Sequence, residues 1–281
     1  MGDLLSRWHA ALAEQSPVAV ATVIDGPGTG SKLLISSDDH VGGAGNDELD
    51  KAVIETARGM LEGGKTGTVH YGPRGQRRME DVAVFVQSFA PPPKMYVFGA
   101  IDFASAVARV GKFMGYRVIV CDARAVFATR ERFPSADEVV VAWPDEFLKT
   151  AEVDGRSVIC VLTHDPKFDV PVLKAALDTP AGYIGAMGSR RTHDNRTARL
   201  TEGGVGDEQL ARISSPIGLD VGARTPEETA IAIAAEIVAL RTGHSGGRLA
   251  ERSGPIHATD PDMPASPDER DARQAAGERA R

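Results

Sequence analysis

Several residue types and sequence patterns are rare or missing in this sequence, and their rarity excludes several classes of protein. It contains two cysteines, Cys121 and Cys160, each inside an apolar run, so neither a disulfide framework nor a metal-binding cysteine motif is predicted. No apolar run approaches the ~20 residues that cross a bilayer, and the N-terminus lacks a signal-peptide pattern. Basic residues do not predominate, because 32 Lys and Arg face 39 Asp and Glu. These features predict a cytoplasmic protein that binds neither nucleic acid nor membrane.

The composition that remains is that of a globular protein with two domains. The chain has 281 residues, 42% of them hydrophobic and 25% charged, which is enough for two modest cores. The stiff run Ala90-Pro91-Pro92-Pro93 marks a linker. We therefore predict an N-terminal α+β domain at residues 1–90 and a second domain at residues 94–243. Apolar residues nearly vanish after Gly243, so residues 244–281 are predicted to be a disordered tail.

The first ninety residues mix helical and strand patterns. Helical spacing of apolar residues predicts helices at Asp3–Gln15 and from a cap at Asn46 or Asp47 to about Leu61. Strands are predicted at Val18–Ile24, Lys32–Ser36, Thr66–Tyr71 and Val82–Phe89. The glycines of DGPGTGS follow the first strand, but no Walker lysine comes after them, so a hairpin loop is the preferred interpretation.

The segment from Lys94 to Arg124 has the pattern of a first Rossmann unit. A buried strand at Met95–Phe98 precedes a Gly-Ala turn, a helix capped by Asp102 and a second strand that ends at Asp122. Further strands are predicted at Glu138–Val141, Arg156–Leu162 and Ala181–Ala186, and helices at Pro144–Ala151, Asp169–Leu177 and from the Thr225 capping box to about Leu240. This alternation predicts an α/β fold, a doubly wound parallel sheet with right-handed crossovers.

Polar and glycine-rich residues follow four of the predicted strands. Because ligands of open α/β sheets bind beyond the carboxyl ends of the strands, we expect these residues to form one site. No catalytic residue and no metal ligand is predicted. The candidate cofactor-binding residues are Gly99, Asp102, Asp122, Arg124, His164, Asp165, Gly185, Gly188, Ser189, Arg190 and Arg191.

The first turn departs from the dinucleotide fingerprint. Ile101 stands at the second glycine of G-x-G-x-x-G, where a branched side chain would block a pyrophosphate, so conventional NAD binding is disfavoured. Asp122 is placed to hold a ribose, and the alternative is a polar strand end that faces water. His164 and Asp165 could act as an acid–base pair, or Asp165 could cap a turn.

The loop Gly185–Arg191 is the stronger candidate for ligand binding. Its glycines allow close backbone approach, Ser189 can cap the next helix, and Arg190 and Arg191 carry guanidinium groups suited to phosphate. The alternative is a glycine turn followed by solvated arginines. The position beyond a strand end favours an anion site.

Four segments of the second domain resemble the XdhC/CoxI family: FGAIDFASAVARVGKFMGYRV, VLTHDPKFDVPVL, GYIGAMGSRRTHDNR and SPIGLDVGARTPEETAIAIAAEI. The resemblance implies a small N-terminal domain followed by a Rossmann-type domain. It also implies an accessory factor, not an enzyme, that binds molybdenum cofactor (molybdopterin). Such a factor would assist insertion of that cofactor into xanthine dehydrogenase or a related molybdenum hydroxylase.

The N-terminal domain departs from the family pattern. The stretch VGGAGNDELDKAV stands where the family has an SGGC motif, and MEDVAVFVQSF lacks the cysteine expected before the Rossmann domain. The thiol that could touch a molybdenum cofactor is therefore absent, and this domain is degenerate. Two alternatives stay open, an NAD(P)-dependent oxidoreductase that uses the Rossmann cleft and an interaction protein without a ligand. The oligomeric state also stays open, a homodimer included.

Overall fold

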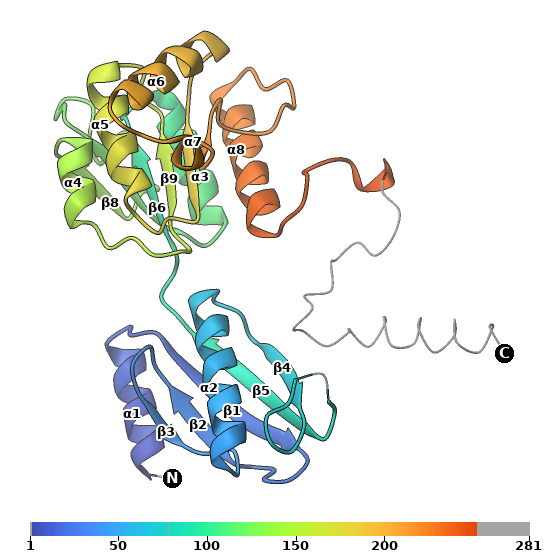
Figure 1. The fold of residues 1–281 in the computed structure, drawn as a ribbon. Helices are drawn as coiled ribbons and strands as arrows, with labels where there is room; N and C mark the ends of the chain where they lie inside the picture. Colours follow the sequence, from blue (N-terminus) through green and yellow to red (C-terminus); the bar gives the residue numbers. More distant parts are fainter. Residues whose placement is uncertain (1, 78, 252–281) are drawn as a thin grey trace. The chain divides into compact units, whose positions relative to one another are not determined.

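We describe the protein from a computed structural model, in residues 2–77 and 79–251 (Figure 1). These residues form two compact units, divided between Pro91 and Pro92. The predicted tail, residues 244–281, lies outside the described residues from position 252 onward. Within the described part of the chain, no helix is long and apolar enough to cross a membrane.

The N-terminal unit contains a five-stranded antiparallel sheet with the strand order β3-β2-β1-β5-β4. The glycine-rich segment between β1 and β2 is the predicted hairpin loop, because these strands pair antiparallel. The short strand β3 was not predicted, because its three residues lie among turn formers and show no alternation. The elements are α1 (Gly2–Ala13), β1 (Val18–Asp25), β2 (Lys32–Ile35), β3 (His40–Gly42), α2 (Asp47–Glu62), β4 (Gly67–Tyr71) and β5 (Val82–Phe89).

Helices α2 and α1 cover opposite faces of this sheet. Asn46 caps α2 as predicted, because its side chain accepts a hydrogen bond from the backbone N–H of Leu49 at 3.0 Å. The buried side of α2 packs on the face that carries Val86. Trp8 of α1 contacts Phe89, with ring centroids 5.5 Å apart. Since Phe89 and Val86 are three residues apart in one strand, their side chains point to opposite faces.

The second unit contains a six-stranded parallel sheet with the order β11-β10-β9-β6-β7-β8. In chain order this is the 3-2-1-4-5-6 arrangement of the Rossmann fold, and its switch point lies between β6 and β9. The predicted fold class is confirmed. The elements are β6 (Lys94–Phe98), α3 (Asp102–Phe113), β7 (Arg117–Asp122), β8 (Glu138–Val141), α4 (Pro144–Thr150), β9 (Val158–Val161), α5 (Pro166–Leu177), β10 (Tyr183–Ala186), α6 (Arg190–Glu202), α7 (Asp207–Leu210), β11 (Ile213–Ser214), α8 (Pro226–Arg241) and η1 (Leu249–Glu251).

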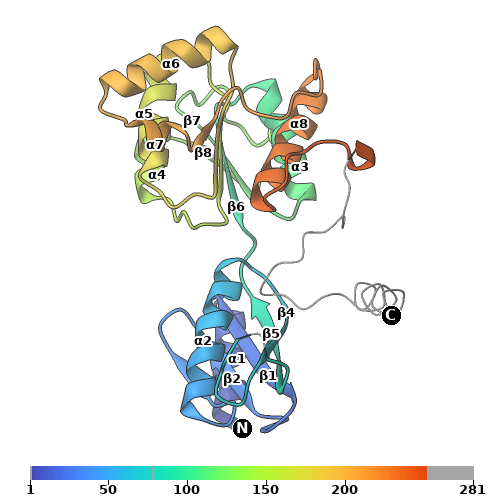
Figure 2. The same cartoon turned by 45° about the vertical axis from the view of Figure 1, so that its right-hand side comes forward.

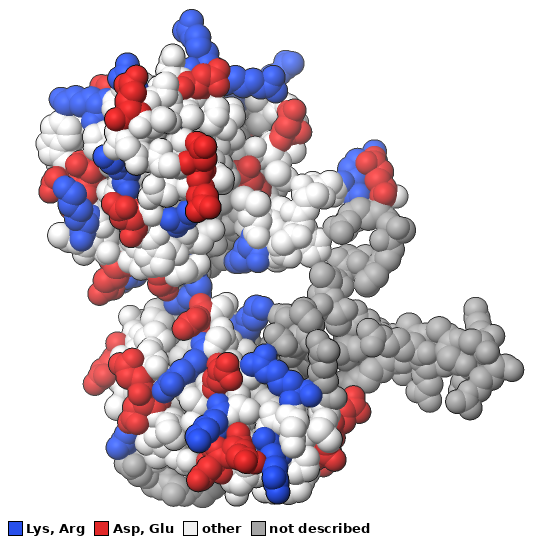
Figure 3. All heavy atoms as spheres, in the orientation of Figure 1, with Lys and Arg blue, Asp and Glu red and all other residues white. Residues whose placement is uncertain are grey.

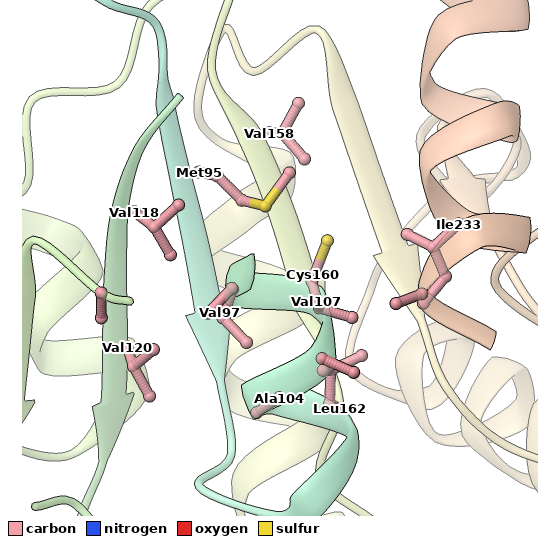
Figure 4. Close-up of a cluster of buried hydrophobic side chains, with 14 of the residues drawn as sticks. Met95, Val97, Ala104, Val107, Val118, Val120, Val158, Cys160, Leu162 and Ile233 are labelled. Atoms are coloured by element: carbon pink, nitrogen blue, oxygen red, sulfur yellow. The ribbon is translucent and has the colours of Figure 1, made fainter. Parts of the chain in front are cut away.

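Helices cover both faces of the parallel sheet, with α3 and α8 on one side and α4, α5 and α6 on the other (Figures 1 and 2). Val97 and Leu162 point toward Val107 of α3 in the core shown in Figure 4. Their neighbours Tyr96 and Val161 belong to the core on the other face. The central strands are thus buried on both sides, which explains why each reads as a continuous apolar run.

Two helix starts differ from the sequence-based expectation. The prediction that Asp102 caps α3 was wrong, because the cap position is Ile101 and Asp102 is the first helical residue. Helix α5 begins at Pro166, and Asp165 caps it by accepting a hydrogen bond from the N–H of Lys167 at 3.0 Å. The competing interpretation of Asp165 as a cap is therefore confirmed.

The surface charge agrees with the modest net charge of the sequence. On the face shown in Figure 3, basic and acidic side chains are interspersed over both units. An interspersed surface gives no broad field that would attract a polyanion.

We predict that Leu162→Ala destabilises the second unit by roughly 2–5 kcal/mol, because its side chain is fully buried and its removal leaves a cavity. The matched control is Leu240→Ala in α8, where the side chain is 55% exposed and the change should stay within about 0.5 kcal/mol. Urea unfolding followed by circular dichroism measures both. Equal losses for the two variants would contradict this core assignment.

Candidate functional site

The turns after β6 and β9 meet at the switch point of the sheet. Gly99 has a φ of +105°, and a Cβ atom there would lie 2.7 Å from the Thr163 Cγ2 atom and 3.0 Å from the Thr163 backbone nitrogen. Only glycine fits this conformation and this spacing. Because β6, β7, β9 and β10 run parallel, the turns that follow them share one edge of the sheet. The candidate residues are therefore gathered at that edge, as predicted by the strand pattern.

Asp122, at the end of β7, is buried and fully engaged within the protein. Its Oδ2 accepts a hydrogen bond from the backbone N–H of Ala100 at 2.7 Å, and its Oδ1 accepts one from the N–H of Arg124 at 2.9 Å. The Arg124 guanidinium binds both oxygens. Burial alone would raise the pKa of Asp122, but these hydrogen bonds hold that pKa below its ordinary value. The alternative of a strand end that faces water is wrong, and a ligand role for Asp122 stays a prediction.

The loop after β10 presents hydrogen-bond donors and positive charge. Ser189 caps α6 as predicted, because its Oγ accepts a hydrogen bond from the N–H of Thr192 at 3.2 Å. Arg190 and Arg191 occupy the first two helical positions, are exposed, and form no ion pair within the described part of the chain. The N-terminal amides of a helix and two adjacent guanidinium groups form an arrangement that attracts anions.

The remaining candidates divide between the surface and the interior. His164 and Asp165 are exposed in the turn after β9. The hydrogen bonds to Asp122 raise the pKa of Arg124, and the charge of Asp165 adds to this effect. Gly185 is buried, and a Cβ atom there would lie 2.5 Å from Ile217, so it serves the packing beneath the site. The structure therefore groups the turn residues but places Gly185 below them.

A buried ion pair supports the loop after β10. Arg196 and Asp169 have side chains only 4% and 3% exposed, and Arg196 Nη2 lies 2.9 Å from Asp169 Oδ2. The same nitrogen donates to the carbonyl of Met187 at 2.7 Å, and Thr163 is hydrogen-bonded to the other Asp169 oxygen. Burial raises the pKa of Asp169, and Arg196 opposes this effect. This network ties α5, α6 and the turns after β9 and β10 together.

The sequence analysis missed this pair, although the sequence contains a signal for it. Asp169 stands on the same side of α5 as Val172, Leu173 and Ala176, which are all buried. Arg196 is four residues before the buried Leu200 of α6. A charged side chain on the buried face of a helix needs an oppositely charged partner. The acidic Asp169 and the basic Arg196, each on such a face, could therefore have been predicted to form an ion pair.

An aromatic pair with one exposed member also lies near the carboxyl ends of the strands and was not predicted. Trp143 precedes α4 and contacts Phe168 of α5, with centroids 5.2 Å apart. The Lys167 ammonium lies 4.7 Å from the centre of the Trp143 ring. Trp143 keeps 45% of its surface exposed, so one aromatic platform remains accessible beside the turn after β9.

A pocket of about 270 Å³ is lined by none of the residues of the loop after β10. Its lining comes from the N-terminal half and middle of α3, the first turn of α8 and the segment that precedes β8, and includes Asp102, Arg109, Arg132 and Glu227. Each arginine faces an acid, with Arg109 2.7 Å from Glu227 and Arg132 3.3 Å from Asp102. The pocket is small for a complete cofactor, so we place the candidate site over the strand ends instead.

The described residues offer no ligand set for a metal ion. They contain no group of three or more His, Cys, Asp or Glu side chains that could hold one. Burial raises the pKa of Cys121 and of Cys160 to about 12, so both thiols stay protonated near neutral pH. The site consists instead of amides, guanidinium groups and aromatic rings.

The strand order of the parallel sheet defines a Rossmann-type domain. Residues 95–237, just over half of the chain, match the family model of the XdhC Rossmann domain, and residues 11–72 match the model of the XdhC and CoxI family. The chain therefore belongs to the XdhC family, and the predicted family is confirmed.

Three relatives share this similarity. A probable xanthine dehydrogenase subunit of Bacillus subtilis (strain 168) is 32% identical over 158 residues, which are 56% of this chain and 46% of that protein. The molybdenum cofactor insertion chaperone PaoD of Escherichia coli (strain K12) is 28% identical over 56% of this chain and 43% of its own. The uncharacterized E. coli protein YqeB is 28% identical over 88% of this chain and 48% of its own. The chain spans less than half the length of these relatives.

A solved structure supports the fold. A crystal structure of a xanthine dehydrogenase from Bacillus halodurans has a TM-score of 0.59 and 22% sequence identity to this chain. The match covers 84% of this chain and 65% of that one. Similarity at this level of identity establishes the architecture alone.

We predict that Arg196→Met destabilises the second unit by about 3–5 kcal/mol, because it leaves the buried Asp169 carboxylate without its partner. The matched control is Arg109→Met, which removes an exposed pair and should cost at most about 1 kcal/mol. Asp169→Leu combined with Arg196→Met removes both charges and should recover part of the loss. Chemical unfolding of the three variants measures this order, and equal stability of the two single variants would refute it.

Proposed function

We propose that the chain is an accessory factor that binds molybdenum cofactor and assists its insertion into xanthine dehydrogenase or a related molybdenum hydroxylase. Two relatives support this role, because one is named a molybdenum cofactor insertion chaperone and the other a probable subunit of xanthine dehydrogenase. The observation that carries the proposal is the loop Gly188–Arg191, a family-matched turn that directs helix amides and two arginines to the ligand edge of the sheet.

The residues of this loop fit the phosphate of a pterin cofactor. Arg190 and Arg191 are exposed at the start of α6 and have no acidic partner among the described residues. Beneath them, the buried Nε of Arg196 has no hydrogen-bond partner in the described part of the chain, so the floor of the loop retains an unused donor. Unused donors and cations favour a phosphate over a neutral group.

The same residues do not fit thiolate ligation of a molybdenum ion. Cys121 and Cys160 are buried and protonated near neutral pH, and the family's N-terminal cysteines are absent from this sequence. In this proposal the chain holds the organic part of the cofactor. Gly188, Ser189, Arg190 and Arg191 would bind its phosphate, while Gly99, His164 and Asp165 would border the same crevice. Gly185 would support the loop from below, and Asp102 would lie at the rim.

The central prediction concerns the two arginines of α6. Arg190→Ala with Arg191→Ala should weaken cofactor binding by well over tenfold, because each charge-assisted contact to phosphate contributes roughly 1.5–3 kcal/mol. The thermal midpoint should hardly change, because both side chains are exposed. Binding is measured as the molybdopterin retained per chain after desalting, detected by fluorescence of its oxidised pterin.

The matched control is Arg199→Ala, which removes an exposed arginine near the other end of the same helix. It should bind the cofactor as the unmodified protein does. Unchanged binding by the double variant would place the phosphate elsewhere. Unfolding of the double variant would show that the arginines are structural.

An NAD(P)-dependent oxidoreductase is the second candidate, and the strand order of the sheet favours it. Ile101 opposes it, because its partly buried side chain packs on the core at the position where a dinucleotide turn needs glycine. We expect no binding of NAD or NADP at micromolar concentrations in titration calorimetry, since the turn cannot approach a pyrophosphate. Two results together would favour the oxidoreductase over the accessory factor. The unmodified protein would bind NAD or NADP stoichiometrically, and the Ile101→Gly variant would bind it no more tightly.

A further inference from the structure

The carboxylate at the end of β7 is already satisfied by the protein. In Rossmann domains an acid at this position holds the hydroxyl groups of a ribose. Asp122 has a side chain only 3% exposed, and it accepts hydrogen bonds from two backbone N–H groups and from the Arg124 side chain. A ribose would have to displace Arg124 to reach it. The acid therefore orients an arginine instead of being free for a ligand.

Arg124 is held so that part of its guanidinium faces outward. Its Nε lies 2.9 Å from Asp122 Oδ1 and its Nη2 lies 2.7 Å from Asp122 Oδ2. This side-on contact leaves Nη1 unused by the described residues, and the side chain is 44% exposed. The guanidinium also lies 4.6 Å from the centre of the Phe127 ring. A cation fixed in this way loses little freedom when it binds an anion.

A second cation contacts the same ring. The Arg132 guanidinium lies 5.5 Å from the centre of Phe127, and its side chain is 35% exposed. Its acidic partner is Asp102, 3.3 Å away, whose side chain is 88% exposed. An ion pair this open to water is weak, so Asp102 can turn away when a stronger anion arrives. Two guanidinium groups thus meet at one aromatic ring beside the ligand edge of the sheet.

We propose that Arg124 and Arg132 form a phosphate subsite around Phe127 at the end of β7, and that Asp122 is a positioning residue for Arg124. The subsite takes a phosphate monoester of a small molecule and disfavours a bare ribose diol. It lies in the crevice of the proposed cofactor site, but β6 and β9 separate β7 from β10 and its loop. It is therefore a second anion position, and the argument for it does not depend on the identity of the cofactor.

Two nucleotides that differ by one phosphate test this proposal on the full chain. We expect 2′,5′-ADP to bind at least about tenfold more tightly than 5′-AMP in titration calorimetry at low salt. Both probes carry a 5′-phosphate, and only the first carries a second phosphate at the ribose 2′ position, which in Rossmann domains lies beside the acid at the end of this strand. Neither probe contains a pyrophosphate, so Ile101 does not affect the comparison. Neither contains a pterin, so the result is independent of the molybdenum cofactor.

Substitutions test whether the two arginines cause the preference for 2′,5′-ADP over 5′-AMP. Arg132→Ala and Arg124→Ala should each reduce the preference at least about fivefold, a loss of about 1 kcal/mol. Arg109→Ala, which removes the arginine of a neighbouring exposed pair, should leave it unchanged. Thermal unfolding is measured for every variant. If Arg124→Ala unfolds because Asp122 loses its partner, Arg132→Ala still decides the question, since its ion pair with Asp102 is open to water.

Three outcomes would overturn the proposal. Equal affinity for the two probes would show that no phosphate subsite exists. Tighter binding of 5′-AMP than of 2′,5′-ADP would mean that Asp122 hydrogen-bonds the hydroxyl groups of a ribose. Failure of 2′,5′-ADP to bind at millimolar concentration would show that the two arginines only stabilise the turns.

Discussion

Parallel pairing of β6 with both β7 and β9 is the constraint on which the rest of the second unit depends. It places the turns after these strands at one edge, and it forces the turn at Gly99 against Thr163 so closely that no side chain fits between them. Helices α3, α5 and α6 then begin at that same edge. Backbone donors, the buried carboxylate that ends β7 and several guanidinium groups are therefore concentrated at that edge.

The sequence predicted the sheet well, because strands buried on both faces read as apolar runs and the helices between them show helical spacing. It also predicted the caps at Asn46 and Ser189, where a polar side chain satisfies a local amide. It failed where a contact depends on how the chain folds back on itself. Asp102 was predicted to cap α3 but pairs with Arg132, which is 30 residues away. For Asp122, the alternative of a strand end that faces water was wrong, because its carboxylate binds the backbone of Ala100 and the side chain of Arg124. Such contacts depend on tertiary packing, which periodicity does not encode.

Two buried carboxylates organise the candidate site in the same way. Asp122 fixes Arg124 at the end of β7, and Asp169 fixes Arg196 beneath the loop after β10. In each case a charge that would be costly alone is stabilised by an arginine from a neighbouring turn or helix. The difference is exposure, since Arg196 is enclosed and supports the loop, while Arg124 keeps an outward-facing edge. In the proposed function, this organisation would allow the domain to attract an anionic ligand without a reactive thiol.

The most direct measurement is a crystal structure of the full chain with molybdenum cofactor bound. The account predicts density for the cofactor over the carboxyl ends of β6, β9 and β10, with its phosphate at the first turn of α6 and within hydrogen-bond distance of Arg190 or Arg191. Density confined to the N-terminal unit, or to the pocket between α3 and α8, would contradict it.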